Sequence, residues 1–285
     1  MGFPYTDVNS TYDCEEASSS LLDGTGSPAT KSMVPQAGPG SIADGKIGKA
    51  RGTLGETAHF RRNVDLDGSQ FDVRGLVSMT ILGWCRVTSL TQSPFFWSVH
   101  DTGNANQQAW QMIANQAGGA GNQVPQFAML DGLTIFNSLS VKATLTGPSM
   151  TINVWHMIGG SYNHVTNRIA CFWGDGNDPS GLTTYYAEAN GFAAGFGFTA
   201  DVQQNNAARF RAGGVNGDFI QIDHVSYWKD RALDEDGFLD HWQGGTALLL
   251  SEFGSDPGRG AGGSVDIDSY HYYWSKRRAR ERVLI

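Results

Sequence analysis

The sequence predicts an all-β protein built as a two-sheet antiparallel sandwich, with one short helix near its C-terminal end. Short apolar runs recur every 8–15 residues between about residues 54 and 228, and clusters of Gly, Asn and Asp separate them. Glycine supplies 37 of the 285 residues, about twice the usual share. No helical pattern lies between the runs, which disfavours the strand–helix alternation of a parallel sheet.

The apolar runs give the expected strands. Met79–Val87 is apolar on both faces, as in a central strand that is covered on both sides. Asp131-Gly132 is a strong hairpin dipeptide and predicts a turn between two strands. Further strands are expected at 94–99, 109–114, 126–130, 133–136, 155–162, 168–173 and 219–228.

One helix is expected after the last strand. Asp234 is a suitable N-cap, and the two acidic residues that follow it favour the positive end of a helix. Leu239 and Trp242 form an apolar stripe, and Gly244-Gly245 ends the segment.

The chain divides into three parts. We expect an N-terminal arm at 1–11, the sandwich at 12–250, and a Gly-rich linker with an aromatic and basic anchoring extension at 251–285. Residues 276–282 carry a net charge of +4, which leaves −12 for the rest of the chain. Because exposed aromatic residues mark contact sites and opposite charges attract, the extension is predicted to bind an assembly partner rather than to be a solvated tail. The predicted assembly contacts are Tyr270, Tyr272, Tyr273, Trp274, Lys276, Arg277, Arg278, Arg280 and Arg282.

Composition excludes several other classes. No run approaches the roughly 18 apolar residues of a membrane-spanning helix, and the N-terminus lacks the basic and apolar regions of a secretory signal. Cys14, Cys85 and Cys171 do not make a disulfide framework, which indicates synthesis in a reducing cytoplasm. An acidic body is not a nucleic-acid-binding face.

Four phrases in the correct order carry a family resemblance: residues 44–50, 78–86, 153–162 and 222–234. Together they resemble the laminin-G-like, concanavalin-A-like jelly-roll family over about residues 12–245. The resemblance implies two stacked antiparallel sheets of six or seven strands each.

Catalytic residues are not evident. Enzymes on this fold place two glutamates and an aspartate along one strand as E-x-D-x-E, so that a carboxylate pair faces the groove. None of the seven glutamates belongs to such a triplet, and the seven histidines are scattered singly. We therefore expect no catalytic residue. His156 is predicted to pack or to hydrogen-bond the backbone.

Metal and sugar sites are open questions. No cofactor is expected to be required. Members of the resembling family often hold one calcium ion, and Asp223 and Glu15 are the candidate ligands of such a structural Ca²⁺, since carboxylate oxygens suit calcium. Glycans bind exposed aromatic rings beside amides and carboxylates. The candidate sugar contacts are Trp97, Asp101, Asn104, Trp110, Trp173, Asp175 and Asn177, although each tryptophan suits the core better than a sugar platform.

The leading functional hypothesis is a non-enzymatic structural or adhesive protein of a bacteriophage virion, as a capsid decoration, head-fibre or tail-associated protein. The absence of a catalytic pattern and of a signal peptide supports it, together with analogy to the family. Its expected partners are other virion proteins, copies of itself and a cell-surface glycan, with no membrane and no nucleic acid. The alternative is a free carbohydrate-binding lectin, and the third is a glycan-cleaving enzyme.

Overall fold

The computed structural model describes residues 10–12, 14, 34–36, 41–54, 59–63, 78–89, 95–101, 108–115, 123–130, 140–191, 208–212, 220–229 and 231–245. The predicted extension at 251–285, and with it every predicted assembly contact, lies outside the described residues. The predicted hairpin around Asp131-Gly132 does so as well.

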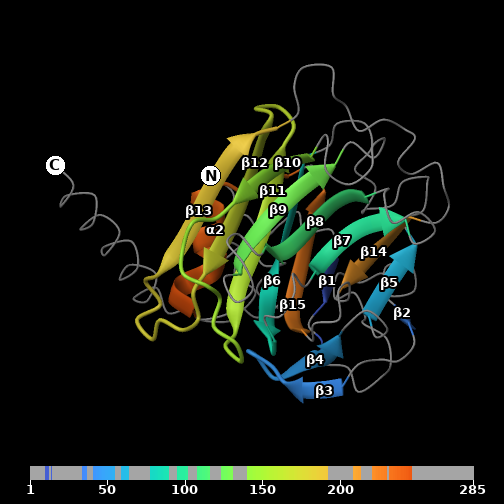
Figure 1. The fold of residues 1–285 in the computed structure, drawn as a ribbon, viewed down its shortest axis with the longest axis vertical. Coiled ribbons are helices and arrows are strands. Elements are labelled where there is room, and N and C mark those ends of the chain that lie inside the picture. Colours follow the sequence, from blue (N-terminus) through green and yellow to red (C-terminus); the bar gives the residue numbers. More distant parts are fainter. Residues whose placement is uncertain are drawn as a thin grey trace, which may run out of the picture.

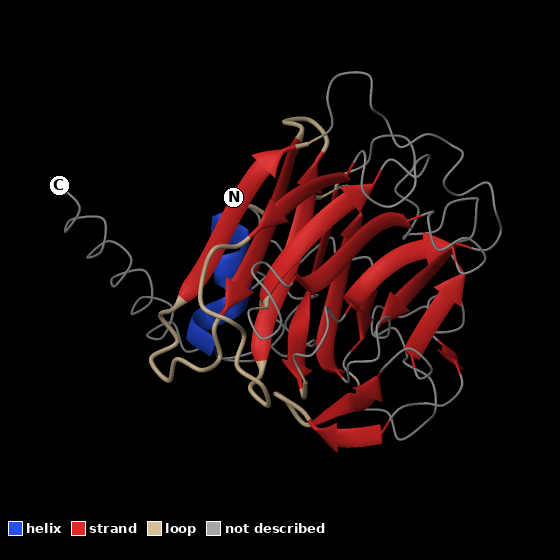
Figure 2. Cartoon of the chain, in the orientation of Figure 1, coloured by secondary structure: helices blue, strands red, loops and turns tan. Residues whose placement is uncertain are grey.

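The described residues form two antiparallel sheets with one helix, so the predicted all-β sandwich is confirmed (Figures 1 and 2). One sheet has eight strands in the order β13-β12-β11-β6-β15-β4-β3, with β1 also paired to β15. Its strands are β1 (Ser10–Tyr12), β3 (Ser41–Asp44), β4 (Lys49–Leu54), β6 (Met79–Val87), β11 (His156–Asn163), β12 (Arg168–Gly174), β13 (Thr184–Asn190) and β15 (Ile220–Lys229). The other sheet has seven, in the order β10-β9-β8-β7-β14-β5-β2. Its strands are β2 (Val34–Gln36), β5 (His59–Asn63), β7 (Phe95–Asp101), β8 (Gln108–Asn115), β9 (Val124–Leu130), β10 (Ser140–Thr144) and β14 (Ala208–Ala212).

The chain crosses between the sheets several times, which is the topology of a jelly roll. Strand β6 pairs with β11 on one side and with β15 on the other, although both are distant in sequence. This strand is apolar on both faces because one face packs on the second sheet and the other on the helix.

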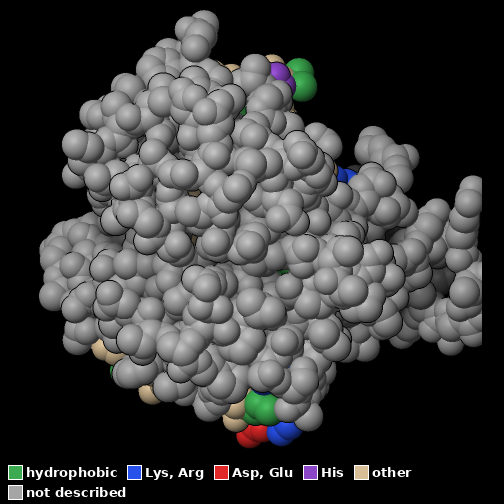
Figure 3. Space-filling view, turned by 90° about the vertical axis from the view of Figure 1, so that its right-hand side faces the viewer, with side chains coloured by type: hydrophobic (Ala, Val, Ile, Leu, Met, Phe, Trp, Pro, Cys, Tyr) green, Lys and Arg blue, Asp and Glu red, His purple; other side chains and the backbone are tan. Residues whose placement is uncertain are grey.

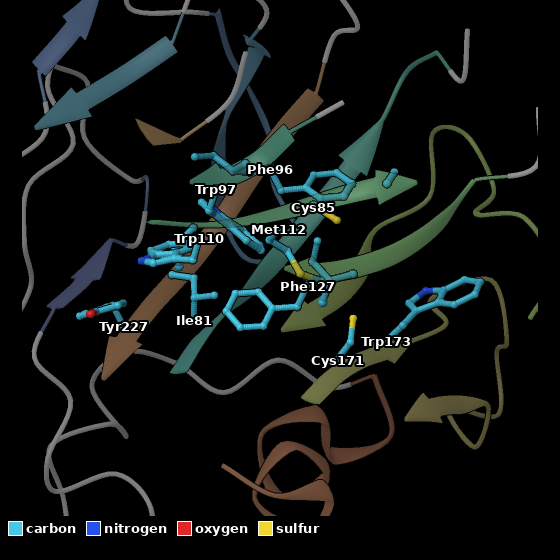
Figure 4. Packing of buried hydrophobic residues seen from close by; sticks show 14 of the residues in the cluster. Ile81, Cys85, Phe96, Trp97, Trp110, Met112, Phe127, Cys171, Trp173 and Tyr227 are labelled. Atoms are coloured by element: carbon cyan, nitrogen blue, oxygen red, sulfur yellow. The ribbon is translucent and has the colours of Figure 1, made fainter. Parts of the chain in front are cut away.

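Large aromatic side chains fill the space between the sheets (Figure 4). Trp97 and Trp110 from the seven-stranded sheet and Trp173 from the eight-stranded sheet are fully buried. Trp110 stacks on Tyr227 of the opposite sheet with 6.3 Å between the ring centroids. The three cysteines are also buried and free, in agreement with the expectation that they form no disulfide framework.

The outer face of the eight-stranded sheet carries helix α2 (Glu235–Trp242) followed by the 3-10 turn η2 (Gln243–Gly245), as Figure 1 shows beside β12 and β13. Asp234 caps the helix as predicted, because its side chain accepts a hydrogen bond of 2.9 Å from the Gly237 amide. The left-handed residue at the C-cap is Gln243, followed by Gly244. Phe238 and Trp242 are the buried apolar side chains of the helix, whereas Leu239 is only partly buried.

The outer face is organised in rows that run across β11, β6 and β15. Since side chains two residues apart share a face, the pairing register defines the members of each row. The segment that leads into α2 covers the first row, where Ser161 donates to the Leu233 carbonyl. Phe238 lies over Gly159 in the second row, and Trp242 packs on Trp84 in the third with 5.3 Å between centroids.

The sequence analysis did not predict several of the strands, among them β10 and β13. Strands β10 and β13 lie at the ends of their sheets, and β13 mixes half-buried and exposed residues instead of alternating. The segment 44–50 that carries the resemblance is the tight turn between β3 and β4. Figure 3 shows acidic and basic side chains together at the lower edge of the molecule, where this hairpin lies.

Candidate functional site

The fourth row of the outer face is left uncovered by α2. Its members are Trp155, which immediately precedes β11, Arg86 at the end of β6, and Gln221 of β15, and we call them the open row. All three side chains are half-buried. Phe238 and Trp242 of the helix cover the second and third rows, whereas the open row offers partly exposed side chains to a ligand on this part of the face.

Arg86 holds the open row together. Its guanidinium carbon lies 5.0 Å from the centre of the Trp155 ring, and its Nε donates to the Gln221 amide oxygen. A cation over an indole ring is attracted by the negative face of the ring. The contacts with Trp155 and Gln221 fix the guanidinium while its two Nη atoms make no hydrogen bond to the described part of the chain.

Lys46, next to the open row, also lies over a tryptophan ring. Its Nζ lies 4.8 Å from the centre of the Trp84 ring, and burial lowers the pKa of its ammonium group. Trp84 and Arg86 are two residues apart on β6, so both cations lie on the same face of the sheet.

Asp223 positions Lys46. Its carboxylate is buried and accepts a hydrogen bond of 2.9 Å from the Ile47 amide, and its other oxygen lies 2.7 Å from His224 Nδ1. A Cβ atom at Gly45 would lie 2.6 Å from the carboxylate, so the turn approaches this closely only because residue 45 is glycine. The pKa of Asp223 is raised because desolvation outweighs the hydrogen bonds from His224 and the turn.

These contacts bear on the predicted calcium site. The described surroundings of Asp223 offer N–H donors instead of the oxygen ligands that calcium needs. No group of three or more His, Cys, Asp or Glu residues within the described ranges could hold a metal ion. Glu15 lies outside these ranges, so the calcium site stays a prediction.

The loop between β12 and β13 borders the open row. A Cβ atom at Gly176 would lie 1.7 Å from the Trp155 carbonyl oxygen, so the two backbones touch. Two predicted sugar contacts, Asp175 and Asn177, are on this loop, and Asn177 is exposed. The structure therefore brings these two residues beside Trp155, which the sequence analysis had assigned to a strand.

Asp178 keeps this loop rigid. Its carboxylate accepts hydrogen bonds from the backbone and side chains of Ser180 and Thr183. These bonds favour the charged form and hold the pKa of Asp178 well below its usual value. Trp242 Nε1 donates to the Gly181 carbonyl at 2.8 Å, which ties the loop to α2.

His156 contacts the same loop, and its role is structural. Its Nδ1 lies 3.1 Å from the Trp173 indole nitrogen and 3.3 Å from the Gly176 amide, and both of these donate hydrogen bonds. Nδ1 is therefore the acceptor, and Nε2 donates to the Thr151 carbonyl. Burial lowers the pKa of His156, so the ring is neutral at pH 7 and its 3.3 Å contact with Asp175 is not an ion pair. The predicted backbone hydrogen bond of His156 is confirmed.

A small cavity lies under the third row. Its volume is about 10 Å³, and it is lined by Leu82, Gly83, Trp84, Met157, His224, Ser226 and His241. This volume accommodates about one water molecule and no sugar. It forms where β15 bulges, with His224 in the left-handed conformation.

The prediction that Trp97, Trp110 and Trp173 contact sugars is wrong. All three rings are fully buried between the sheets, where no ligand can stack on them. The physical reason is that inward-facing positions of a sandwich need large apolar side chains. Asp101 ends β7, and Asn104 lies outside the described residues. Trp155 is half-buried instead of fully buried, and it was missed as a candidate because its sequence context is that of a buried strand.

The comparisons agree with the fold. No protein-family model and no curated protein sequence matches this chain. Among solved structures, the chain is similar to the binding domain of botulinum neurotoxin serotype C1 (TM-score 0.53, 11% identity, 83% of this chain and 51% of that one). It is similar to the binding domain of botulinum neurotoxin DC in complex with rat synaptotagmin II (TM-score 0.53, 11% identity, with 83% and 51% of the two chains covered).

A third structure is the binding domain of botulinum neurotoxin DC in complex with SialylT (TM-score 0.51, 10% identity, with 83% and 50% of the two chains covered). The chain spans about half the length of these structures. At this identity the likeness shows the fold alone, a β-sandwich of the kind that the two sheets form. No described helix has the length and hydropathy needed to cross a membrane.

Proposed function

We propose that this protein is a carbohydrate-binding, lectin-like module whose sugar site is the open row with the adjoining β12–β13 loop. The observation that carries the proposal is the half-buried Trp155 ring under the Arg86 guanidinium, which Gln221 also binds, with the backbone of the β12–β13 loop against residue 155. An aromatic face beside oriented amides and a carboxylate is the chemistry that binds a sugar ring.

The fold supports a binding role. The three similar structures are binding domains by their titles, one in complex with SialylT and one with rat synaptotagmin II. The fold is therefore compatible with a sugar ligand and with a protein ligand. The sequence has no E-x-D-x-E triplet, which favours binding over glycan cleavage.

The virion setting is the finer part of the sequence-based hypothesis. It depends on analogy to the resembling family and on the absence of a catalytic pattern and of a signal peptide, and neither the described residues nor the similar structures add support to it. A sugar-binding module fits a virion adhesin and a free lectin equally well. We therefore propose the lectin-like activity and leave the virion location as a prediction.

A glycan array with the full-length chain tests the proposal, followed by titration calorimetry on the best ligand. Trp155→Ala should reduce affinity about tenfold or more, since stacking and buried apolar contact are lost. Leu239→Ala is the matched control, because it truncates another partly buried side chain of the same face away from the open row. Titrations in EDTA and in millimolar calcium test the predicted calcium site at the same time. Absence of binding to every glycan, or equal affinity of Trp155→Ala and the wild type, would contradict the proposal.

A further inference from the structure

Two cations on the outer face share an unusual environment. Arg86 lies over Trp155 and Lys46 lies over Trp84, each within 5.0 Å of the ring centre. Neither forms an ion pair with a carboxylate of the described residues. By contrast, the nearby Lys49 is paired with Asp44 at 3.2 Å, and Arg168 on β12 is paired with Glu188 at 2.8 Å.

The two cations also lie close to each other on this face of the sheet. Trp84 and Arg86 are two positions apart on β6, and so about 7 Å apart along the strand. The Asp223 carboxylate lies opposite Trp84, but its oxygens are bonded to Ile47 and His224. The described carboxylates therefore neutralise only part of the positive charge on this face.

The hydrogen-bond donors of Arg86 indicate which class of ligand it binds. With Nε bonded to Gln221, the two Nη atoms still provide four N–H donors in a planar fork. That fork matches the two oxygens of a carboxylate, and a cation that is already partly desolvated binds an anion more strongly than one in water. The guanidinium carbon lies 5.0 Å from the centre of the Trp155 ring, so a ligand whose carboxylate meets the fork also lies close to an indole.

We propose that the open row selects a sugar that carries a carboxylate, with Arg86 binding the carboxylate, Lys46 adding charge and Trp155 packing on the sugar ring. This inference rests on the proposed lectin-like function and names its ligand class. A long polyanion is a poorer fit, because the chain outside residues 276–282 carries a net charge of −12 and repels it.

The test compares sialyllactose, its methyl ester and lactose in calorimetric titrations, beside an array that includes neutral, uronate-containing and sulfated glycans. An acidic sugar should bind about tenfold or more tightly than its neutral counterpart. Arg86→Gln and Lys46→Gln should each reduce that preference, Arg86 the more strongly, and binding should weaken with added salt. Lys49→Gln is the matched control, because it removes the same charge from the same hairpin.

Arg86→Lys separates charge from geometry, since it keeps the cation but loses the fork, and it should restore only part of the preference. Circular dichroism and thermal midpoints establish that each variant is folded. Neutral glycans bound as tightly as acidic ones, or a preference unchanged in Arg86→Gln, would overturn the inference while leaving the lectin-like function intact. Binding to sulfated glycans alone would overturn the choice of carboxylate. Absence of binding to any glycan would overturn the proposed function itself.

Discussion

The two faces of the eight-stranded sheet are buried by different means. The inner face meets a second sheet, and fully buried tryptophans and phenylalanines fill the space between them. The outer face meets α2, which has eight residues and is therefore about 12 Å long, whereas the nine residues of β6 span about 30 Å. A second sheet covers the whole length of the strands, and a short helix covers only part of it.

The comparison explains where a site can form. On the inner face the central strands are closed by large rings, whereas Tyr185, Ala187 and Ala189 of the edge strand β13 are partly buried. On the outer face, the rows under α2 are closed by Phe238 and Trp242, and the row beyond the helix keeps Arg86, Gln221 and Trp155 half-exposed. The end of the helix thus sets the border of the candidate site.

The largest expected effect is on the inner face. Trp173→Ala should reduce the free energy of unfolding by about 3–5 kcal/mol, because a fully buried ring is removed. The variant also loses the hydrogen bond from the indole to His156. Urea denaturation followed by tryptophan fluorescence measures the change. An unchanged midpoint would mean that Trp173 is not in the core.

The next effect is an acid-dependent loss of stability from the helix-covered rows. Burial, with a contribution from the charge of Arg231, lowers the pKa of His241 to about 3. In the unfolded chain its pKa is near 6.5. The unfolded state therefore binds the proton more readily, and stability falls as the pH drops from about 6.5 toward 3. The slope from this residue reaches about 1.4 kcal/mol per pH unit.

His241→Gln isolates this contribution, because glutamine stays neutral throughout the range. Urea denaturation at several pH values between 4 and 7 should show a shallower dependence in the variant than in the wild type. His164→Gln is the control, since it alters a histidine in the turn between β11 and β12. Parallel curves for His241→Gln and the wild type would contradict the buried, neutral state of His241.

A smaller effect is expected at the start of the helix. Asp234→Ala removes the side chain that caps the Gly237 amide and should cost about 1 kcal/mol. Asp234→Asn, which can cap equally well, should cost much less. Thermal unfolding monitored by circular dichroism distinguishes the two variants, and equal losses would argue against capping.

A tryptophan of the open row should contribute far less to stability than Trp173. Trp155→Ala should cost less than about 1.5 kcal/mol, because its ring is only partly buried where it packs against the outer cluster and contacts Arg86. If Trp155→Ala lost as much stability as Trp173→Ala in the same urea experiment, the distinction between a closed core and an open row would fail.

The sequence by itself determined the sandwich, the position of the helix and its cap. Short apolar runs separated by turn residues fold only as strands, and Asp234 with its acidic neighbours marks a helix start through local chemistry. The same local reasoning assigned His156 correctly to a structural hydrogen bond. It also named Asp175 and Asn177, which the structure places beside Trp155.

Only the tertiary structure decided which tryptophans face solvent. Trp155 and Trp173 both lie in apolar surroundings along the chain, so periodicity cannot separate them. Trp173 faces the second sheet. Trp155 lies one row beyond Trp84, on which the last helix residue, Trp242, packs. Likewise, the pairing of Gly45 with Asp223 joins residues that are 178 positions apart. Exposure is set by what covers a residue, and the covering segments come from distant parts of the chain.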